Sequence, residues 1–350
     1  MKYFLEESPT AAEKSDIGRF VKLSRHAHWL QHPLWVEISG RTRLGQYLFF
    51  WGEEEGQIQV SALVRRMRLP VLGWAKDTVE RGPVCDSIDL MIESLHQLAH
   101  MLEACGAVSL TVNPYWFNTG AEEVENLLSE MGFFRPDRGS GPHSASLVID
   151  LLPGEEEILG SLRKKTRYEI RKAERLGIEV TPAQDETDIV AFCQLYQDSA
   201  VALGLKPLAE DYLIRLWRLL LRGQEDGVCL MARYRGELVS ADIVLKHGDR
   251  AEYTYAPSSV QKWPDVPKNH LCLWRTLTWA KARGCTTYDL GGIAPTAQDG
   301  SQIAGVNQFK QGFSDKQVRL VREHERVFRP ARRTWLSTIA SYRGRMLPTA

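Results

Sequence analysis

Apolar and polar residues follow two patterns along the first half of the chain, one typical of strands and one typical of helices. Residues 47–69 form two apolar runs around the acidic segment Glu53–Gly56, which predicts two strands joined by a turn. Leucine and methionine recur at helical spacing over residues 87–106, and the closing glycine is a helix stop. A short apolar run at 107–114 then predicts a buried strand. Residues 121–133 predict a second helix, with acids in its first turn.

The second half of the chain repeats this order of elements loosely. It begins with a helix or helix pair over residues 154–177 and continues with two more helices. A meander of three strands follows, and after it come a helix and a short buried strand. The remaining expected ranges are helices at 188–204, 209–223 and 269–285, the meander at 227–259, the buried strand at 286–293 and a last strand at 319–330.

Each half therefore contains a meander, a helix that ends in glycine and a short strand. Residues 95–114 and 271–292 are the clearest matching pair. This order predicts a mixed α/β (α+β) fold of two similar units, with a cleft between them as the natural site. The Pro-, Gly- and Glu-rich segment around Asp150–Glu155 is the expected boundary, which gives domains at 1–152 and 153–321.

Composition narrows the class of protein. The chain has 350 residues and a net charge of +0, so an anionic partner must be bound by local basic patches. Its six cysteines show no paired spacing, which favours reduced thiols in a cytoplasmic protein. The first residues contain no apolar signal-peptide core, and no apolar run is long enough for a membrane span.

The most basic stretch is the predicted helix at 163–175, where seven cations stand against two acids. It is either a solvated helix face or a surface that binds phosphates of RNA or of a nucleotide-linked substrate, with Tyr168 as a stacking face. The arginine-rich end, residues 321–346, either closes the first unit as a helix or contacts acidic lipid headgroups at the inner face of the membrane. The predicted tRNA and phosphate contacts are Lys164, Lys165, Arg167 and Arg171.

Several kinds of chemistry have no motif here. The chain has no nucleophile elbow, no Walker A loop and no G-x-G-x-x-G, and His96 and His100 have no third metal ligand nearby. No metal and no cofactor are therefore expected. Tyr253 and Tyr255 alternate on one predicted strand and either pack in the core or line the cleft, and Trp35 has the same two alternatives.

Three segments in order resemble the Fem family, the aminoacyl-tRNA-dependent transferases that build peptidoglycan side bridges. They are "RGPVCD" at Arg81–Asp86, the basic segment Ser161–Val180, and "YDLGGI" followed by "GVNQFKQGF" at Gly305–Phe313. The resemblance spans most of the chain. It implies two tandem acetyltransferase-like (GNAT) domains, with residues 322–350 returning to the first, in a monomer.

The resemblance also implies a reaction. A side-chain amine of the stem peptide of a UDP- or lipid-linked peptidoglycan precursor attacks the ester of an aminoacyl-tRNA. Such an amine needs no activated serine or cysteine, but the tetrahedral oxyanion needs a fixed positive charge. Lys310, flanked by Phe309, matches the lysine that has this role in the family.

The resemblance also implies contacts to the precursor. Lys206 and Tyr212 occupy the region where the family has an arginine and a tyrosine, although lysine lacks arginine's bidentate fork. Asn113 stands where the family often has an aspartate before proline, and an amide cannot accept the proton of an ammonium. The predicted precursor-binding set is Trp35, Asn113, Lys206, Tyr212, Tyr253 and Tyr255.

Two other functions remain open from the sequence. One is an N-acyltransferase of the same double fold that uses another donor, such as acyl-CoA, on a different amine. The missing glycine loop before a helix argues against it, because backbone N–H groups at a helix start hold such phosphates. The other is a binding protein that keeps the fold without catalysis.

Overall fold

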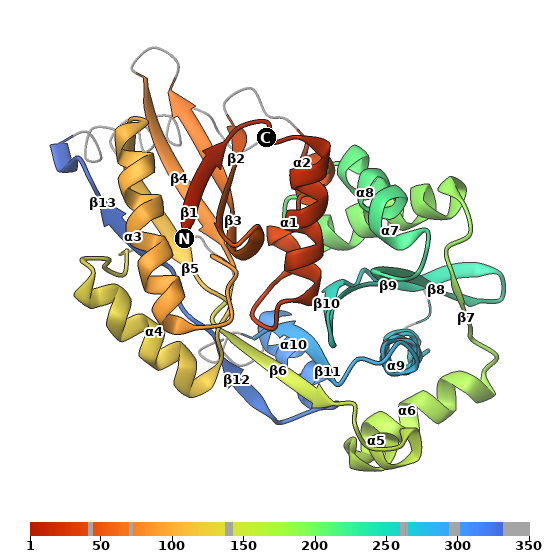
Figure 1. Cartoon of the computed structure of the whole chain (residues 1–350). Coiled ribbons are helices and arrows are strands. Elements are labelled where there is room, and N and C mark those ends of the chain that lie inside the picture. Colours follow the sequence, from red (N-terminus) through yellow and green to blue (C-terminus); the bar gives the residue numbers. More distant parts are fainter. Residues whose placement is uncertain are drawn as a thin grey trace. The chain divides into compact units, whose positions relative to one another are not determined.

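The computed structural model describes residues 1–40, 45–69, 73–136, 143–259, 263, 265–293 and 302–331 (Figure 1). The chain forms two compact units. Unit 1 contains the described residues within Met1–Val36, Gly40–Pro142 and Leu320–Ala350, and unit 2 contains those within Glu37–Ser39 and His143–Arg319. None of the described helices is both long and apolar enough to cross a bilayer.

Unit 1 is built on a six-stranded sheet in the order β1-β2-β3-β4-β5-β13. Only β4 and β5 run parallel, and the other neighbours are antiparallel. Its strands are β1 (Lys2–Glu6), β2 (Gly45–Glu54), β3 (Gln57–Leu69), β4 (Trp74–Glu80), β5 (Ala107–Asn113) and β13 (His324–Val327). Its helices are α1 (Ala11–Leu23), the short η1 (Trp29–Gln31), α2 (Leu34–Ser39), α3 (Ile88–Ala104) and α4 (Asn118–Glu130).

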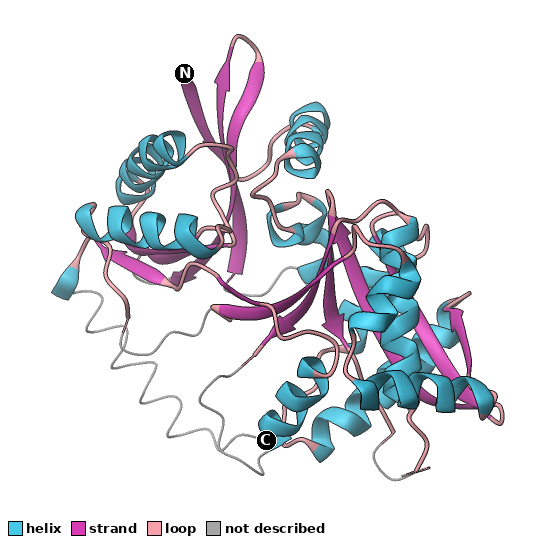
Figure 2. Cartoon of the chain, turned by 90° about the horizontal axis from the view of Figure 1, so that it is seen from below, coloured by secondary structure: helices cyan, strands magenta, loops and turns pink. Residues whose placement is uncertain are grey.

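The sheet of unit 1 is buried on both faces, which explains the continuous apolar run "YLFFW" in β2. Leu48 and Phe50 pack in one hydrophobic cluster with α3 and α4, whereas Phe49 and Trp51 pack in a second cluster with α1. Successive side chains of a strand point to opposite faces, so both faces of β2 need apolar residues. Figure 2 shows helices on both sides of the strands that include the N-terminus.

Unit 2 is built on a seven-stranded sheet in the order β12-β6-β11-β10-β9-β8-β7, with β10 and β11 as its parallel pair. Its strands are β6 (Ala145–Asp150), β7 (Glu179–Pro182), β8 (Gly227–Tyr234), β9 (Glu237–His247), β10 (Arg250–Tyr255), β11 (Thr287–Gly292) and β12 (Gln317–Arg319). Its helices are α5 (Glu155–Ser161), α6 (Lys164–Arg175), α7 (Glu186–Ala202), α8 (Glu210–Leu216), the π-helical η2 (Trp217–Leu221), α9 (Lys268–Ala282) and α10 (Gln302–Gln311).

Helices also cover the sheet of unit 2. The apolar faces of α5, α6 and α9 join one hydrophobic cluster with the strands and Phe313, and α7 and η2 pack against β9 and β8. Figure 1 shows α9 and α6 on one side of these strands and α7 and α8 on the other. The helix pair expected over residues 154–177 is confirmed as α5 and α6.

The repeated order of elements is confirmed. In unit 1 the meander β2-β3-β4 is followed by α3 and by β5, which lies parallel to β4. In unit 2 the meander β8-β9-β10 is followed by α9 and by β11, which lies parallel to β10. A crossover helix between parallel strands is the common element of both units.

The division between the units differs from the expected one. It falls between Pro142 and His143, because β6 pairs with β11 and β12 and so belongs to the second sheet rather than to residues 1–152. The chain returns to unit 1 at Leu320, and β13 pairs with β5 there. Most of the arginine-rich end, for which a closing helix or a lipid contact was expected, lies outside the described residues.

Each unit buries a polar side-chain pair in its sheet. In unit 1 the guanidinium of Arg66 donates twice to the carboxylate of Asp77, from Nε and Nη2, at 2.8 Å in both cases. In unit 2 the hydroxyl of Tyr253 donates to Oδ1 of Asp242 at 3.0 Å. Burial raises the pKa of this carboxyl to about 7, although hydrogen bonds with Cys272 and Tyr253 act against this. The core of unit 2 therefore favours an uncharged Asp242.

We predict that Asp242→Asn stabilises the protein at pH 8 but not at pH 5. A carboxyl whose folded-state pKa is raised from 3.8 to about 7 binds its proton more tightly in the folded chain. Folding stability therefore falls as pH rises through that window, and the deficit is complete above it. Asparagine carries no such charge. Urea unfolding at both pH values measures the difference, with the exposed Asp211→Asn as control. Equal differences at the two pH values would contradict the prediction.

Candidate functional site

The site is centred on the end of β11, where the strand bends. Glu252 of β10 and Asp289 of β11 are register neighbours in the parallel pair, and the pairing of β11 with β6 becomes irregular after Asp289. Gly291 has φ of 76°, and a Cβ there would lie 3.0 Å from the carbonyl oxygen of Tyr253. Glycine is the residue that fits this left-handed, crowded position. The bend leaves the carbonyl of Gly292 available to a donor outside the strand ladder.

Lys310 supplies that donor from the last turn of α10. Its Nζ donates to the carbonyl oxygen of Gly292 at 2.8 Å, and a Cβ on Gly291 would lie 3.5 Å from the same nitrogen. Burial lowers the pKa of Lys310, and the nearby carboxylates of Asp289 and Glu252 raise it, with burial the larger effect. A half-buried ammonium with few water molecules around it is a strong electrostatic group.

Asp289 holds the bend on which Lys310 rests. It is 2 % exposed, and its Oδ1 accepts the backbone N–H of Gly291 at 2.7 Å and the hydroxyl of Ser146. Its carboxylate thus fixes the backbone that carries the Gly292 carbonyl and supplies negative charge near the ammonium. Asp289 therefore affects both the position and the pKa of Lys310.

Aromatic rings cover α10 beside the lysine. The ring of Phe309 meets His270 of α9 edge to face at 5.1 Å between centroids, and Phe313 lies at 5.4 Å from Phe309 and 6.2 Å from His270. Burial lowers the pKa of His270, Glu169 opposes this change, and Lys165 adds to it. These three rings fix the orientation of α10 and exclude water from one side of it.

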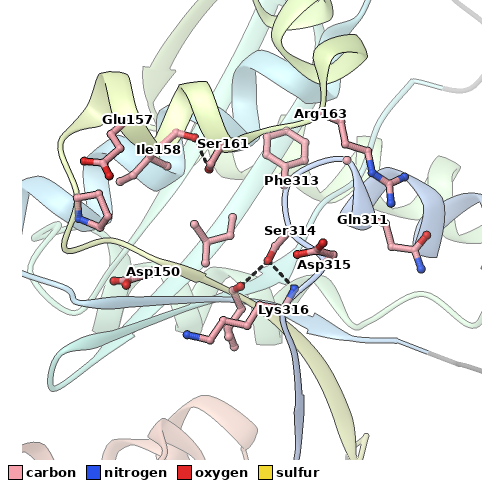
Figure 3. A pocket seen from close by; sticks show the side chains of 14 residues that line it. Asp150, Glu157, Ile158, Ser161, Arg163, Gln311, Phe313, Ser314, Asp315 and Lys316 are labelled. Atoms are coloured by element: carbon pink, nitrogen blue, oxygen red, sulfur yellow. Dashed lines mark hydrogen bonds between the residues drawn. The ribbon is translucent and has the colours of Figure 1, made fainter.

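A cavity of about 300 Å³ lies next to the segment that follows Lys310 (Figure 3). Phe313 is one wall, and the hydroxyl of Ser314 donates to the carbonyl of Val148 at 2.6 Å at its base. Lys310 itself does not line the cavity. The charged side chains that line the cavity are Asp150, Glu157, Arg163, Asp315 and Lys316. The described residues contain no group of three His, Cys, Asp or Glu that could hold a metal ion.

Two predicted precursor contacts come together in unit 2. The hydroxyls of Tyr212 in α8 and Tyr255 in β10 lie 2.9 Å apart, and Tyr196 meets Tyr255 edge to face. Burial raises the pKa of Tyr255 to about 12, although the hydrogen bond with Tyr212 acts against this. Lys206 is exposed in the segment before α8. The two tyrosines thus present a fixed pair of polar tips on an aromatic base.

Two other predicted precursor contacts are buried and hydrogen-bonded within the protein. Tyr253 belongs to the core, because it is 9 % exposed and its hydroxyl is bound to Asp242. Asn113 is 2 % exposed, and its Oδ1 accepts the backbone N–H of Arg81 at 2.8 Å. It therefore holds the "RGP" segment of unit 1 in place. Trp35 is half-buried and meets Trp29 edge to face at 4.3 Å.

The cations of the basic helix α6 differ in their exposure and contacts. Lys164, Lys165 and Arg171 are exposed. Arg167 is partly buried, and its Nη1 donates to the carbonyls of Gly160, at 2.8 Å, and Leu162. Its role is to join the end of α5 to the start of α6.

Sequence reasoning missed three residues of the site. Asp289 and the glycine bend lie in the quoted segment "YDLGGI", where an acid before two glycines is a usable signal. His270 has no local signal, because only the packing of α9 against α10 brings its ring to Phe309. Glu252 likewise becomes relevant only through strand pairing.

Comparison with known proteins finds relatives of this chain in sequence and in fold. Residues 160–311 match the family described as Acetyltransferase (GNAT) domain. The chain is 25% identical over 233 residues to UDP-N-acetylmuramoylpentapeptide-lysine N(6)-alanyltransferase of Weissella viridescens, which covers 63% of this chain and 67% of the relative.

Solved structures agree with the fold over nearly the whole chain. FemX matches with a TM-score of 0.81 at 16% identity, covering 95% of this chain and 98% of FemX. L-PGS from Bacillus licheniformis matches with a TM-score of 0.57 at 12% identity, covering 92% of this chain and 93% of L-PGS. A tandem GNAT protein from the clavulanic acid biosynthesis pathway matches with a TM-score of 0.51 at 10% identity, covering 93% of this chain and 98% of that protein.

These findings agree with the two repeated units, each with a helix between parallel strands, and with the lysine at the end of the second. The protein is an acyltransferase of tandem GNAT architecture, and it is similar to the alanyltransferase of Weissella viridescens and, in fold, to FemX.

Proposed function

We propose that the protein transfers an amino acid from an aminoacyl-tRNA to a side-chain amine in the stem peptide of a peptidoglycan precursor. The observation that carries the proposal is the half-buried ammonium of Lys310, fixed on the Gly292 carbonyl beside Asp289. The named activity of the Weissella relative, alanyl transfer to a lysine of a UDP-linked pentapeptide, supports the choice of acceptor.

In this reaction the neutral amine attacks the ester carbonyl of the donor, and a C–N bond forms. The carbonyl oxygen becomes an oxyanion, which the ammonium of Lys310 stabilises. The C–O bond to the terminal ribose then breaks, the ribose oxygen takes up the proton that the amine loses, and the amide and free tRNA leave. The rings of Phe309, His270 and Phe313 support this step by keeping the lysine stem in place.

The precursor is proposed to contact the paired hydroxyls of Tyr212 and Tyr255, with Lys206 and Trp35 as further contacts. The tyrosine pair supports this assignment, because a fixed aromatic base with two polar tips suits a sugar or peptide group. We propose that the enzyme acts as a monomer in the cytoplasm, where charged tRNA is made.

A second candidate function is acyl transfer from acyl-CoA, which the match to the GNAT domain favours. In this chain α9 begins at Lys268 after Pro267, and the described residues just before it include no glycine that would let a pyrophosphate approach the backbone. Acyl-CoA therefore serves as the alternative donor in the assay below.

We predict that purified protein forms a new amide on a lysine-containing UDP-linked or lipid-linked precursor when charged tRNAs are supplied, and that Lys310→Ala lowers kcat by about 10²–10³-fold. The loss follows from removing the cation that faces the oxyanion. Mass spectrometry of the product measures both. Lys246→Ala removes a cation of the same sheet away from the site and is the matched control. Product from acyl-CoA alone, or unchanged turnover in Lys310→Ala, would contradict the proposal.

We also predict that the alkaline limb of kcat lies below the ordinary lysine pKa of 10.5, because burial lowers the pKa of Lys310 and only its protonated form stabilises the oxyanion. Asp289 raises this pKa, so Asp289→Asn moves the limb to still lower pH. Profiles of kcat against pH measure the shift, with Asp211→Asn as control. A limb that stays in place when Asp289 is neutralised would show that this carboxylate does not act on Lys310.

A further inference from the structure

Four exposed residues of α6 lie in one row. Lys164, Tyr168, Arg171 and Arg175 are spaced by four, three and four positions, which places them on the same face of a helix. We call these four residues the α6 stripe. Tyr168 is 55 % exposed and interrupts the row of cations with a ring that solvent reaches. The row extends over about 16 Å of helix axis.

Most of the other side chains of α6 are already occupied, with Lys165 as the exposed exception. Thr166, Ile170 and Ala173 are buried, and α6 packs against α9. Lys172 donates to the carbonyl of Asp265 at 2.9 Å, and Arg167 is bound to the end of α5. Within the described part of the chain, no hydrogen bond or ion pair involves a side chain of the stripe. The apolar face is thus unavailable to a bilayer, and the exposed cations are available to an anion.

The stripe begins close to the catalytic lysine. The backbone N–H of Arg163 donates to the carbonyl of Gly312 at 3.1 Å, and Phe313 donates to the carbonyl of Lys310 at 2.9 Å. Thr166 approaches Gly312 so closely that an added Cβ would lie 2.5 Å from its hydroxyl oxygen. The first turn of α6 therefore packs directly on the residues that follow Lys310.

We propose that the α6 stripe binds the sugar-phosphate backbone of the RNA donor and directs its 3′ end toward Lys310. About 16 Å of a nucleic-acid duplex carries on the order of ten phosphates, enough for three cations to contact. Tyr168 interrupts the row of cations with an exposed ring, on which an unpaired base can stack. This inference rests on the proposed function for the identity of the RNA, and it adds Arg175 to the contacts.

The test is the affinity of the full-length protein for an uncharged RNA minihelix with a single-stranded 3′ end, measured by fluorescence anisotropy over a range of salt. The triple variant Lys164→Gln/Arg171→Gln/Arg175→Gln is expected to weaken binding by tenfold or more. Its plot of log affinity against log salt is expected to lose a slope of about 2–3, since each lost phosphate contact removes about 1. The matched control is Lys14→Gln/Arg19→Gln/Lys22→Gln on α1, which removes the same charge and is expected to change neither quantity beyond twofold.

Tyr168→Ala tests the stacking contact separately. It is expected to weaken binding of the minihelix by about tenfold, but not binding of a blunt duplex that lacks the single-stranded end. Equal loss with both RNAs would remove Tyr168 from the proposal. Circular dichroism and thermal unfolding of each variant check that α6 remains folded.

Two results would overturn the stripe as an RNA site. One is equal loss of affinity in the α6 and α1 triple variants. The other is unchanged RNA affinity in the α6 variant together with lost binding to phosphatidylglycerol vesicles, which would assign the stripe to lipid. Because the RNA is uncharged, binding is independent of turnover. Failure of every charged tRNA as donor, together with RNA binding that the α6 variant weakens as expected, would reject the proposed function alone.

Discussion

The hydrogen bond from Lys310 to the carbonyl of Gly292 is the interaction on which the site depends. It requires a backbone carbonyl that points out of the strand ladder, and the left-handed Gly291 provides the bend that makes this possible. Asp289 fixes the bend by accepting the N–H of Gly291. The rings packed on α10 then determine where the lysine stem begins. Sheet, bend and helix thus converge on one ammonium group.

The two units use the same arrangement for different purposes. In unit 1 the parallel pair β4–β5 ends at Asn113, whose side chain is buried and holds the backbone of Arg81. In unit 2 the parallel pair β10–β11 ends at the glycine bend, and its carbonyl receives a lysine from α10. The strand end in unit 1 is closed by a buried amide, whereas the strand end in unit 2 is bent and holds a half-buried cation. The repeat therefore accounts for the fold but does not by itself supply two catalytic sites.

Most of the fold could be predicted from the sequence, because apolar periodicity, glycine residues at helix ends and turn residues are local signals. It missed the place of β6, since pairing with β11 and β12 is a long-range property of a short apolar segment. In the site, the motif around Lys310 was readable, but the surroundings of polar side chains were not. Tyr253, Asn113 and Arg167 looked available to ligands, and each is instead bound to a partner that only the folded chain supplies.

The most direct test of the account is the pKa of Lys310 itself, measured by NMR titration of lysine labelled with ¹³C at Cε. The resonance that is lost in Lys310→Arg identifies the residue. Because burial outweighs the opposing effect of Asp289 and Glu252, we expect this resonance to titrate at lower pH than those of the exposed lysines. A Lys310 that titrates together with the exposed lysines would contradict the central claim that a half-buried ammonium is held at the end of β11.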